Sequence, residues 1–183
     1  MRSILNKRKR EKAGFTLSET LIAILILLMV SAIVAGAIPA ASNVYVKTVD
    51  AANAQLLLST TMTVLRDELG TATSIKVEDA STITYRSGKN GCAKIQVVTG
   101  GTDPGLYIWH GEYKDGIPDF TNSTPRLLVS KKAATEGMVV SCTFSESGGV
   151  VTVSDLSVKK DMNKDGTPEE LAGRTSYKIR PVA

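Results

Sequence analysis

Hydrophobic and polar residues are distributed very unevenly along this chain. Between Leu21 and Ile38 there is no charged residue, and Ser31 is the only polar side chain. This run of about 18 residues is close to the length that an α-helix needs to cross a hydrocarbon core of roughly 30 Å. The pattern predicts a membrane-spanning segment over about residues 20–41.

Beyond the apolar run, the pattern becomes that of an amphipathic helix. Apolar residues recur at roughly helical spacing while polar side chains occupy the other faces. The recurring residues are Val46, Val49, Leu57, Leu58, Val64, Leu65 and Leu69. Gly70 is a typical helix stop. The sequence therefore predicts one long helix over residues 15–69, with a membrane half and a soluble half, roughly 80 Å long if it is unbroken.

Residues 70–183 carry the signals of strands and turns. Seven segments are rich in β-branched and aromatic residues, and clusters of Gly, Ser and Asn separate them. These segments are 82–86, 93–99, 106–113, 126–130, 138–145, 150–158 and 177–180. Short separations favour antiparallel hairpins, and a single sheet packed on the soluble half of the helix would bury the apolar stripe of each. We therefore expect an α+β fold with a long N-terminal helix on an antiparallel β-sheet.

The formal charge of +4 arises at the N-terminus. Residues 1–14 hold six basic residues and one acid, a charge of +5, which leaves −1 for residues 15–183. A basic cluster beside an apolar run keeps its side of the membrane cytoplasmic, so we expect a cytoplasmic leader and a C-terminal domain outside. A nucleic-acid-binding tail is the competing interpretation. The adjacent membrane segment disfavours it, and we expect no direct nucleic-acid binding.

The border between the basic cluster and the apolar run has an unusual order. An ordinary secretory signal places small residues after its apolar stretch, whereas Gly14 and Phe15 precede it here. A signal-peptide cut within the Ala-rich stretch 32–41 is the alternative. A cut between Gly14 and Phe15 would instead create a new α-amino group at Phe15.

Glu19 places a carboxylate at the edge of the apolar run, where an ionised acid is costly and needs a partner. An α-amino group at Phe15 would lie four residues earlier, and the two charges attract strongly in low dielectric, although burial has a desolvation cost. Between neighbouring subunits displaced along a filament axis, the pairing can be direct. The alternative is that Glu19 sits at headgroup level and favours the positive N-terminus of its own helix.

Residues 12–21 (KAGFTLSETL) and the apolar run after them resemble the prepilin cleavage and methylation segment of type IV pilins and type II secretion pseudopilins. The resemblance implies cleavage after Gly14 by a prepilin peptidase and N-methylation of Phe15. It also implies that Glu19 sets the register of each subunit against its neighbour. The subunits, copies of this chain and other pilins, would form a helical filament that assembly platform proteins build. Pilins often carry a helix-bending proline in this segment, for which Gly36 and Pro39 are the candidates.

Three functions are therefore compared. The first is a structural subunit of a type IV pilus or related filament, and a pseudopilin of a secretion or DNA-uptake system shares the same N-terminus. The second is a signal-anchored surface binding protein that never polymerises and retains residues 1–14. The third, a membrane-tethered enzyme, has no catalytic constellation to support it, because the only histidine, His110, lies in a predicted strand without a nucleophile signal.

Three aromatic residues, Tyr107, Trp109 and Tyr113, share one phase of a predicted strand. Packing in the core or on the sheet surface explains this spacing. A binding platform is the alternative.

Cys92 and Cys142 are the only cysteines. Outside the cytoplasm a disulfide is plausible, and closing a loop of about 50 residues would add roughly 3–4 kcal/mol. Cys142 shares a strand phase with Val140 and Phe144, which predicts that it faces inward, whereas Cys92 follows a turn signal. Two unpaired thiols are the alternative, because the sequence cannot place the two Cβ atoms within reach.

The stretch 161–169 resembles the opening of a calcium loop, with oxygen side chains at Asp161, Asn163 and Asp165 before a glycine. The match fails where an EF-hand needs a bidentate Glu, because Ala172 stands there; Glu169 or Glu170 could substitute in a looser loop. The alternative is a solvated turn held by Asx hydrogen bonds. We expect a weak calcium site at most, and no cofactor is required.

Overall fold

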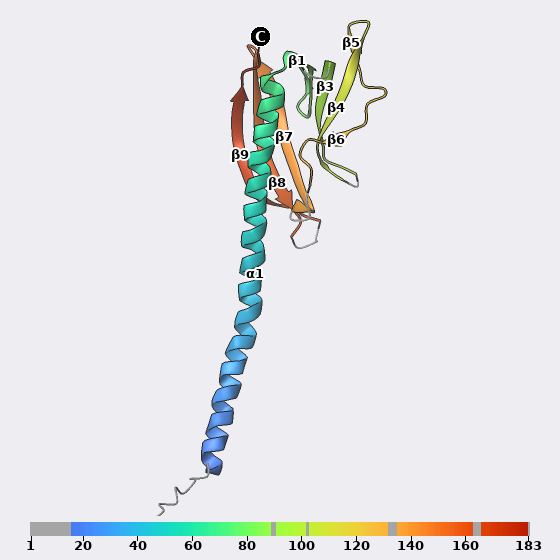
Figure 1. The fold of residues 1–183 in the computed structure, drawn as a ribbon. Helices are drawn as coiled ribbons and strands as arrows, with labels where there is room; N and C mark the ends of the chain where they lie inside the picture. Colours follow the sequence, from blue (N-terminus) through green and yellow to red (C-terminus); the bar gives the residue numbers. More distant parts are fainter. Residues whose placement is uncertain (1–15, 89–90, 102, 132–134, 163–165, 183) are drawn as a thin grey trace, which may run out of the picture. The chain divides into compact units, whose positions relative to one another are not determined.

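The computed structural model describes residues 16–88, 91–101, 103–131, 135–162 and 166–182. The chain divides into two compact units, Met1–Val46 and Lys47–Ala183. One α-helix, α1 (Leu17–Gly70), contributes to both units (Figure 1). The predicted long helix is confirmed, and it ends at the predicted glycine.

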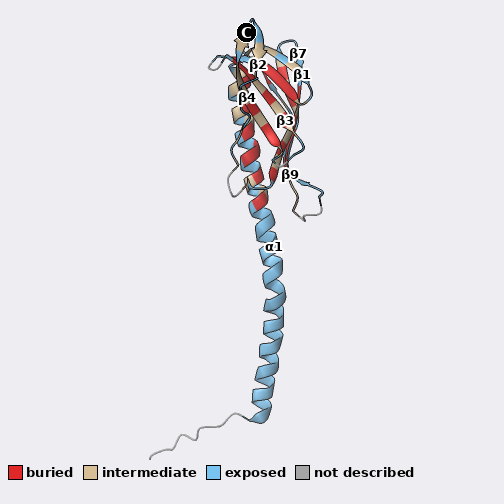
Figure 2. Ribbon diagram, turned by 90° about the vertical axis from the view of Figure 1, so that its right-hand side faces the viewer, coloured by how far each residue is buried: buried red, intermediate tan, exposed pale blue. Residues whose placement is uncertain are grey.

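In the first unit, every described residue is exposed (Figure 2). The helix continues without interruption through both Gly36 and Pro39, the two positions considered for local loosening. Its one polar residue between Leu21 and Ile38, Ser31, donates its hydroxyl hydrogen bond to the carbonyl of Leu27 at 2.8 Å. The hydroxyl of Ser31 is thus hydrogen-bonded within the helix, and the outward surface between Leu21 and Ile38 is apolar.

In the second unit, the last turns of α1 bury one face against the sheets. The buried residues follow helical spacing and are Asp50, Ala54, Leu57, Leu58, Thr61, Leu65 and Leu69. Val46 and Val49, which the sequence pattern placed on the apolar stripe, are exposed instead, and Val64 is half-buried. The stripe is therefore narrower than predicted and begins at Asp50.

The strands form two antiparallel sheets, a six-stranded one and a three-stranded one, where the sequence analysis expected a single sheet. The first has the order β1-β2-β3-β4-β5, with β6 also on β4, and the second has the order β7-β8-β9. The strands are β1 (Thr73–Asp79), β2 (Thr82–Ser87), β3 (Gly91–Val98), β4 (Gly105–Lys114), β5 (Ile117–Asp119), β6 (Arg126–Leu127), β7 (Met138–Ser147), β8 (Val150–Lys160) and β9 (Glu169–Ile179). The prediction failed because β5 and β6 occupy the free edge of β4, so β7 starts a new sheet.

Three strands differ most from the sequence expectation. β1 and β5 were not predicted, and β9 begins at Glu169 although the β-branched and aromatic signal starts only at Tyr177. β1 and β9 carry several charged residues at exposed positions, and these residues lower the β-propensity of both segments. Pairing with a neighbour, β2 or β8, decides their conformation.

One hydrophobic core joins α1 to both sheets. The two sheets meet where the backbone N–H of Phe144 on β7 donates to the carbonyl of Ala80, in the turn between β1 and β2, at 2.8 Å. Two polar contacts tie the helix to the sheets: the hydroxyl of Tyr85 donates to Glu68 Oε2 at 3.2 Å, and Lys160 Nζ pairs with Asp50 Oδ1 at 2.8 Å. Burial is the main reason why the pKa of Tyr85 lies well above its usual value.

Candidate functional site

The N-terminal end of α1 is closed by two side chains that bond each other's backbone. The hydroxyl of Thr16 accepts from the backbone N–H of Glu19 at 3.4 Å, and Glu19 Oε2 accepts from the backbone N–H of Thr16 at 2.9 Å. The Thr16 hydroxyl also donates to the same Oε2 at 2.9 Å. This is a capping box, in which an N-cap Thr and a Glu three residues later satisfy two otherwise unpaired donors.

The capping box gives Glu19 a role inside its own helix. A negative charge in the first turn is also favoured by the helix dipole, so the local alternative considered for Glu19 has a structural basis. Both hydrogen bonds that the carboxylate accepts from Thr16 reach Oε2, however, and no described residue bonds Oε1. Within the described residues, one oxygen of this carboxylate therefore has no hydrogen-bond partner. The sequence analysis missed Thr16, although the Thr-x-x-Glu spacing was available as a signal.

The apolar stem, Leu17–Val46, follows directly on this cap. Large apolar side chains point outward all around the helix, and the most exposed of them, Leu17, is 85% exposed. The helix is long and apolar enough to cross a membrane by length and composition. A helix that is apolar on every side must be covered, by lipid or by other protein. The charge-free part of the stem, residues 21–38, thus requires an apolar partner.

Residues 9–35 match the family model of the prokaryotic N-terminal methylation motif. This motif is the signature of type IV pilins and pseudopilins, so the chain carries a prepilin-type N-terminus. The motif together with the apolar stem indicates membrane anchoring and a structural subunit. No match was found among curated proteins or among solved structures.

Two predicted processing residues fall within the matched motif but outside the described residues. Gly14 and Phe15 lie in the segment 1–15, and Thr16 is the first described residue. Cleavage after Gly14 and methylation of Phe15 therefore stay predictions. The motif implies processing by a prepilin peptidase and polymerisation with pilins.

The two cysteines are both free and buried in the structure. Cys142 lies in the core with Val140 and Phe144, as its strand phase predicted. Cys92 is the second residue of β3, beside its connection to β2, and lies in the opposite phase to the core residue Ala93. Because successive side chains of a strand point to opposite faces, Cys92 points away from the core and donates to the carbonyl of Glu112 at 3.3 Å. In the structure the two thiols are therefore unpaired, which is the alternative to a disulfide.

Thiol labelling checks this arrangement. Burial raises the pKa of Cys142 to about 12, so the folded thiol stays protonated where an unfolded one ionises near 9.0. Its contribution to stability is therefore intact at neutral pH and declines as the pH rises above about 9. At pH 8 we expect slow alkylation of the native chain, and two adducts per chain after denaturation without reductant. A denatured, unreduced chain that takes up no label would show a disulfide.

The aromatic residues of β4 lie on the face of the six-stranded sheet that points away from the core. The rings of Tyr107 and Trp109 are 6.1 Å apart, and Lys94 Nζ lies 4.7 Å from the Trp109 ring and 5.3 Å from that of Phe120. Arg86 covers Tyr113 at 4.9 Å. These contacts use the exposed ring faces within the sheet itself, which favours the packing interpretation over a binding platform.

His110 lies half-buried on the same strand, with its side chain in the alternate phase. Its Nδ1 is buried and has no hydrogen-bond partner among the described residues.

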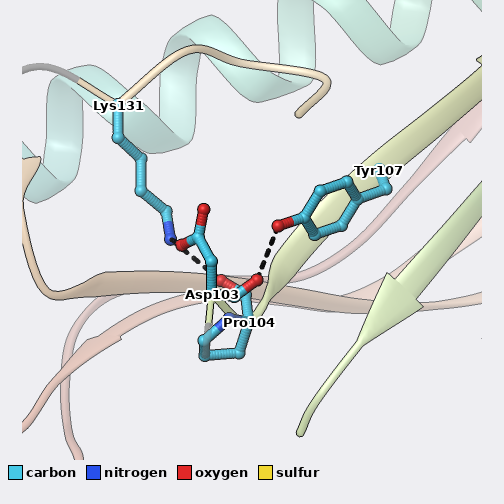
Figure 3. A network of polar contacts seen from close by, with 4 residues as sticks. All are labelled: Asp103, Pro104, Tyr107 and Lys131. Atoms are coloured by element: carbon cyan, nitrogen blue, oxygen red, sulfur yellow. Dashed lines mark hydrogen bonds and ion pairs between the residues drawn. The ribbon is translucent and has the colours of Figure 1, made fainter. Parts of the chain in front are cut away.

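The loop between β3 and β4 is held by a polar network that the sequence did not reveal (Figure 3). Lys131 Nζ donates to Asp103 Oδ1 at 2.5 Å and to the carbonyl of Pro104 at 2.9 Å, and the Tyr107 hydroxyl donates to the carbonyl of Asp103 at 2.6 Å. The hydrogen bond from Lys131 lowers the pKa of Asp103. Lys131 lies 28 positions after Asp103, and no local pattern announces the contact. The network fixes a loop on the surface and has no sign of chemistry.

The candidate calcium loop is only partly described. Asn163 and Asp165 lie outside the described residues, while Glu169 begins β9 and is exposed. Asp161 Oδ2 accepts from the backbone N–H of Gly166 at 2.9 Å, as in a turn closed by an Asp side chain. Within the described parts of the chain, no group of three or more His, Cys, Asp or Glu side chains is placed to hold a metal ion.

Calcium binding remains an expectation that a thermal melt can check. If the loop binds calcium, chelator should lower the melting temperature of the wild-type chain, and Asp165→Ala should remove that difference. A weak site of the extracellular type has a Kd of about 10⁻⁴–10⁻³ M, so the melts should include about 5 mM calcium, several times Kd. Equal melting temperatures in all four conditions would leave the loop as a turn.

Proposed function

We propose that this chain is a structural subunit, a major or minor pilin, of a type IV pilus or a related filament. It would enter the membrane as a prepilin with its leader, residues 1–14, in the cytoplasm and its C-terminal unit outside. Cleavage after Gly14 and N-methylation of Phe15 would prepare it for polymerisation through the apolar stem.

The observation that carries the proposal is the combination of the stem and its cap. The stem is exposed and apolar on every side, and its N-terminal end presents a carboxylate oxygen, Glu19 Oε1, that no described residue bonds. Lipid can cover the apolar surface but offers little to an acid at the hydrocarbon edge. A bundle of stems can satisfy both requirements.

Leader removal supplies the missing donor. Before cleavage, the N-terminal end of α1 continues into the leader, and Phe15 has only an amide. After cleavage, the α-amine of Phe15 is a cation, with an ordinary pKa near 7.7–8.0 that methylation leaves basic. Placed against Oε1 of a neighbouring subunit in low dielectric, this amine would form a charge-assisted hydrogen bond, which is stronger than a neutral one. The pairing would set the axial register of the stems.

A non-polymerising surface anchor explains the stem but not the acid. A signal anchor requires an apolar span and flanking positive charge, and both are present before any cut. It assigns no role to Gly14 or to the open oxygen of Glu19. The same N-terminus would serve a pseudopilin, in which the filament stays within the cell envelope.

Shearing cells that express the chain with its assembly machinery tests the proposal. We expect the chain in the sheared, high-molecular-mass fraction, as filaments that an antibody to residues 47–183 decorates in electron microscopy. A chain found only as detergent-extracted monomer in the membrane, with its machinery present and other subunits assembling normally, would contradict it.

A further inference from the structure

An open groove of about 540 Å³ crosses the three-stranded sheet beside the turn between β1 and β2. Ser141 pairs with Ser157 across β7 and β8, and Ser157 pairs with Gly173 across β8 and β9. Directly opposite residues in antiparallel strands lie on the same face, so these three small residues form one transverse row. The hydroxyls of Ser141 and Ser157 are 3.1 Å apart. The groove thus presents serine hydroxyls, with the carboxylate of Glu170 lying over Gly173, and Ala80, Val97, Cys142 and Leu156 add apolar surface to its lining.

The walls of the groove carry four charged side chains. Lys159 and Arg174 are cations, and Asp155 and Glu170 are acids, which gives the lining a formal charge of zero. None of the four makes a hydrogen bond or ion pair with another described residue. Asp155 lies at a bulge of β8 with a backbone φ of 52°, a conformation that non-glycine residues rarely adopt. The bulge turns this acid out of the regular alternation of its strand.

We propose that this groove binds a neutral oligosaccharide. Its volume falls within the range of small-ligand sites. Serine and threonine hydroxyls both donate and accept, carboxylates accept, and guanidinium donates, so the polar part of the lining matches a ligand rich in hydroxyl groups. An apolar ligand would leave these polar groups unpaired, which is costly. A polyanion would gain nothing from a lining of zero net charge.

A peptide is the competing occupant. Extended peptides usually add along a free strand edge or place side chains in apolar pockets. This groove instead runs across three paired strands, over a floor of serine and glycine. The geometry therefore favours the saccharide. The inference concerns the unit Lys47–Ala183 and does not depend on polymerisation.

The test uses the full-length chain in a polyoxyethylene detergent, because alkyl glycoside detergents carry the proposed ligand. An array of neutral glycans identifies the best binder, and titration calorimetry with that glycan then compares four proteins. We expect Arg174→Ala to weaken binding about tenfold or more, the loss of one charge-assisted hydrogen bond. Thr175→Trp, which fills the groove from an exposed position, should abolish binding. Lys178→Ala removes an exposed cation of the same strand outside the groove, and should bind as the wild type does.

Three results would overturn the inference. The first is a wild-type chain that a thermal melt shows to be folded and that nevertheless binds no glycan on the array. The second is glycan binding that Arg174→Ala and Thr175→Trp leave unaltered. The third comes from a parallel titration with mixed-charge heptapeptides. It is peptide binding that Thr175→Trp blocks and that no glycan displaces.

Discussion

Replacing Glu19 with Gln is expected to lower incorporation of the chain into filaments at least about tenfold, while leader cleavage continues. Gln can still close a capping box, because its amide oxygen accepts from the Thr16 N–H. It has no charge to neutralise the amine of Phe15 in a neighbouring stem. Removing one partner of a buried ion pair costs about 3–5 kcal/mol, and each 1.4 kcal/mol corresponds to tenfold in an equilibrium constant. The ratio of sheared to membrane-retained chain measures the effect.

Thr16→Ala provides the matched control, because it removes the cap and leaves the carboxylate. Loss of an N-cap costs about 1 kcal/mol of helix stability, and we expect near-normal incorporation. If Glu19 acts only within its own helix, the order reverses: Thr16→Ala assembles poorly and Glu19→Gln assembles well. That reversal would remove the registering role from Glu19.

Leu65→Ala is expected to lower the free energy of unfolding of the unit Lys47–Ala183 by about 3 kcal/mol. Leu65 is fully buried in the core that joins α1 to both sheets. Truncating a buried leucine removes its burial and leaves a cavity, at a cost of about 2–5 kcal/mol. A thermal melt followed by circular dichroism in detergent should show a loss of roughly 10 °C.

Leu56 offers a control on the same helix. It is 64% exposed, so Leu56→Ala should leave the melting temperature of the isolated chain within about 1 °C of the wild type, as expected for an exposed site. Equal effects of the two substitutions would show that this part of α1 does not pack on the sheets as described.

The helix and the apolar character of its first half could be predicted from the sequence because their signals are local. The charge-free run, the basic cluster and Gly70 each act within a few residues, and the capping pair Thr16 and Glu19 was readable in the same way. The α+β class also followed, since the change from helical to strand periodicity is a property of neighbouring residues.

Long-range pairing was the part that the sequence could not supply. Hairpin signals specify which strands are neighbours in sequence, but not that β5 and β6 would occupy the edge of β4 and divide the sheet in two. The sequence left the disulfide and the unpaired thiols both open for a related reason. The phase of Cys142 was readable from Val140 and Phe144, whereas the phase of Cys92 depended on where β3 begins. The groove, likewise, exists only through the cross-strand register of Ser141, Ser157 and Gly173.

The central claim is that trimming the leader exposes an amine at Phe15 for a neighbour's acid. The most direct measurement is the mass of the N-terminal peptide from native protein extracted from membranes and filaments. The account predicts a peptide that begins at Phe15 and carries one added methyl group on its amine. A functional surface protein whose N-terminal peptide still contains Met1, or is uncut between Gly14 and Phe15, would contradict it.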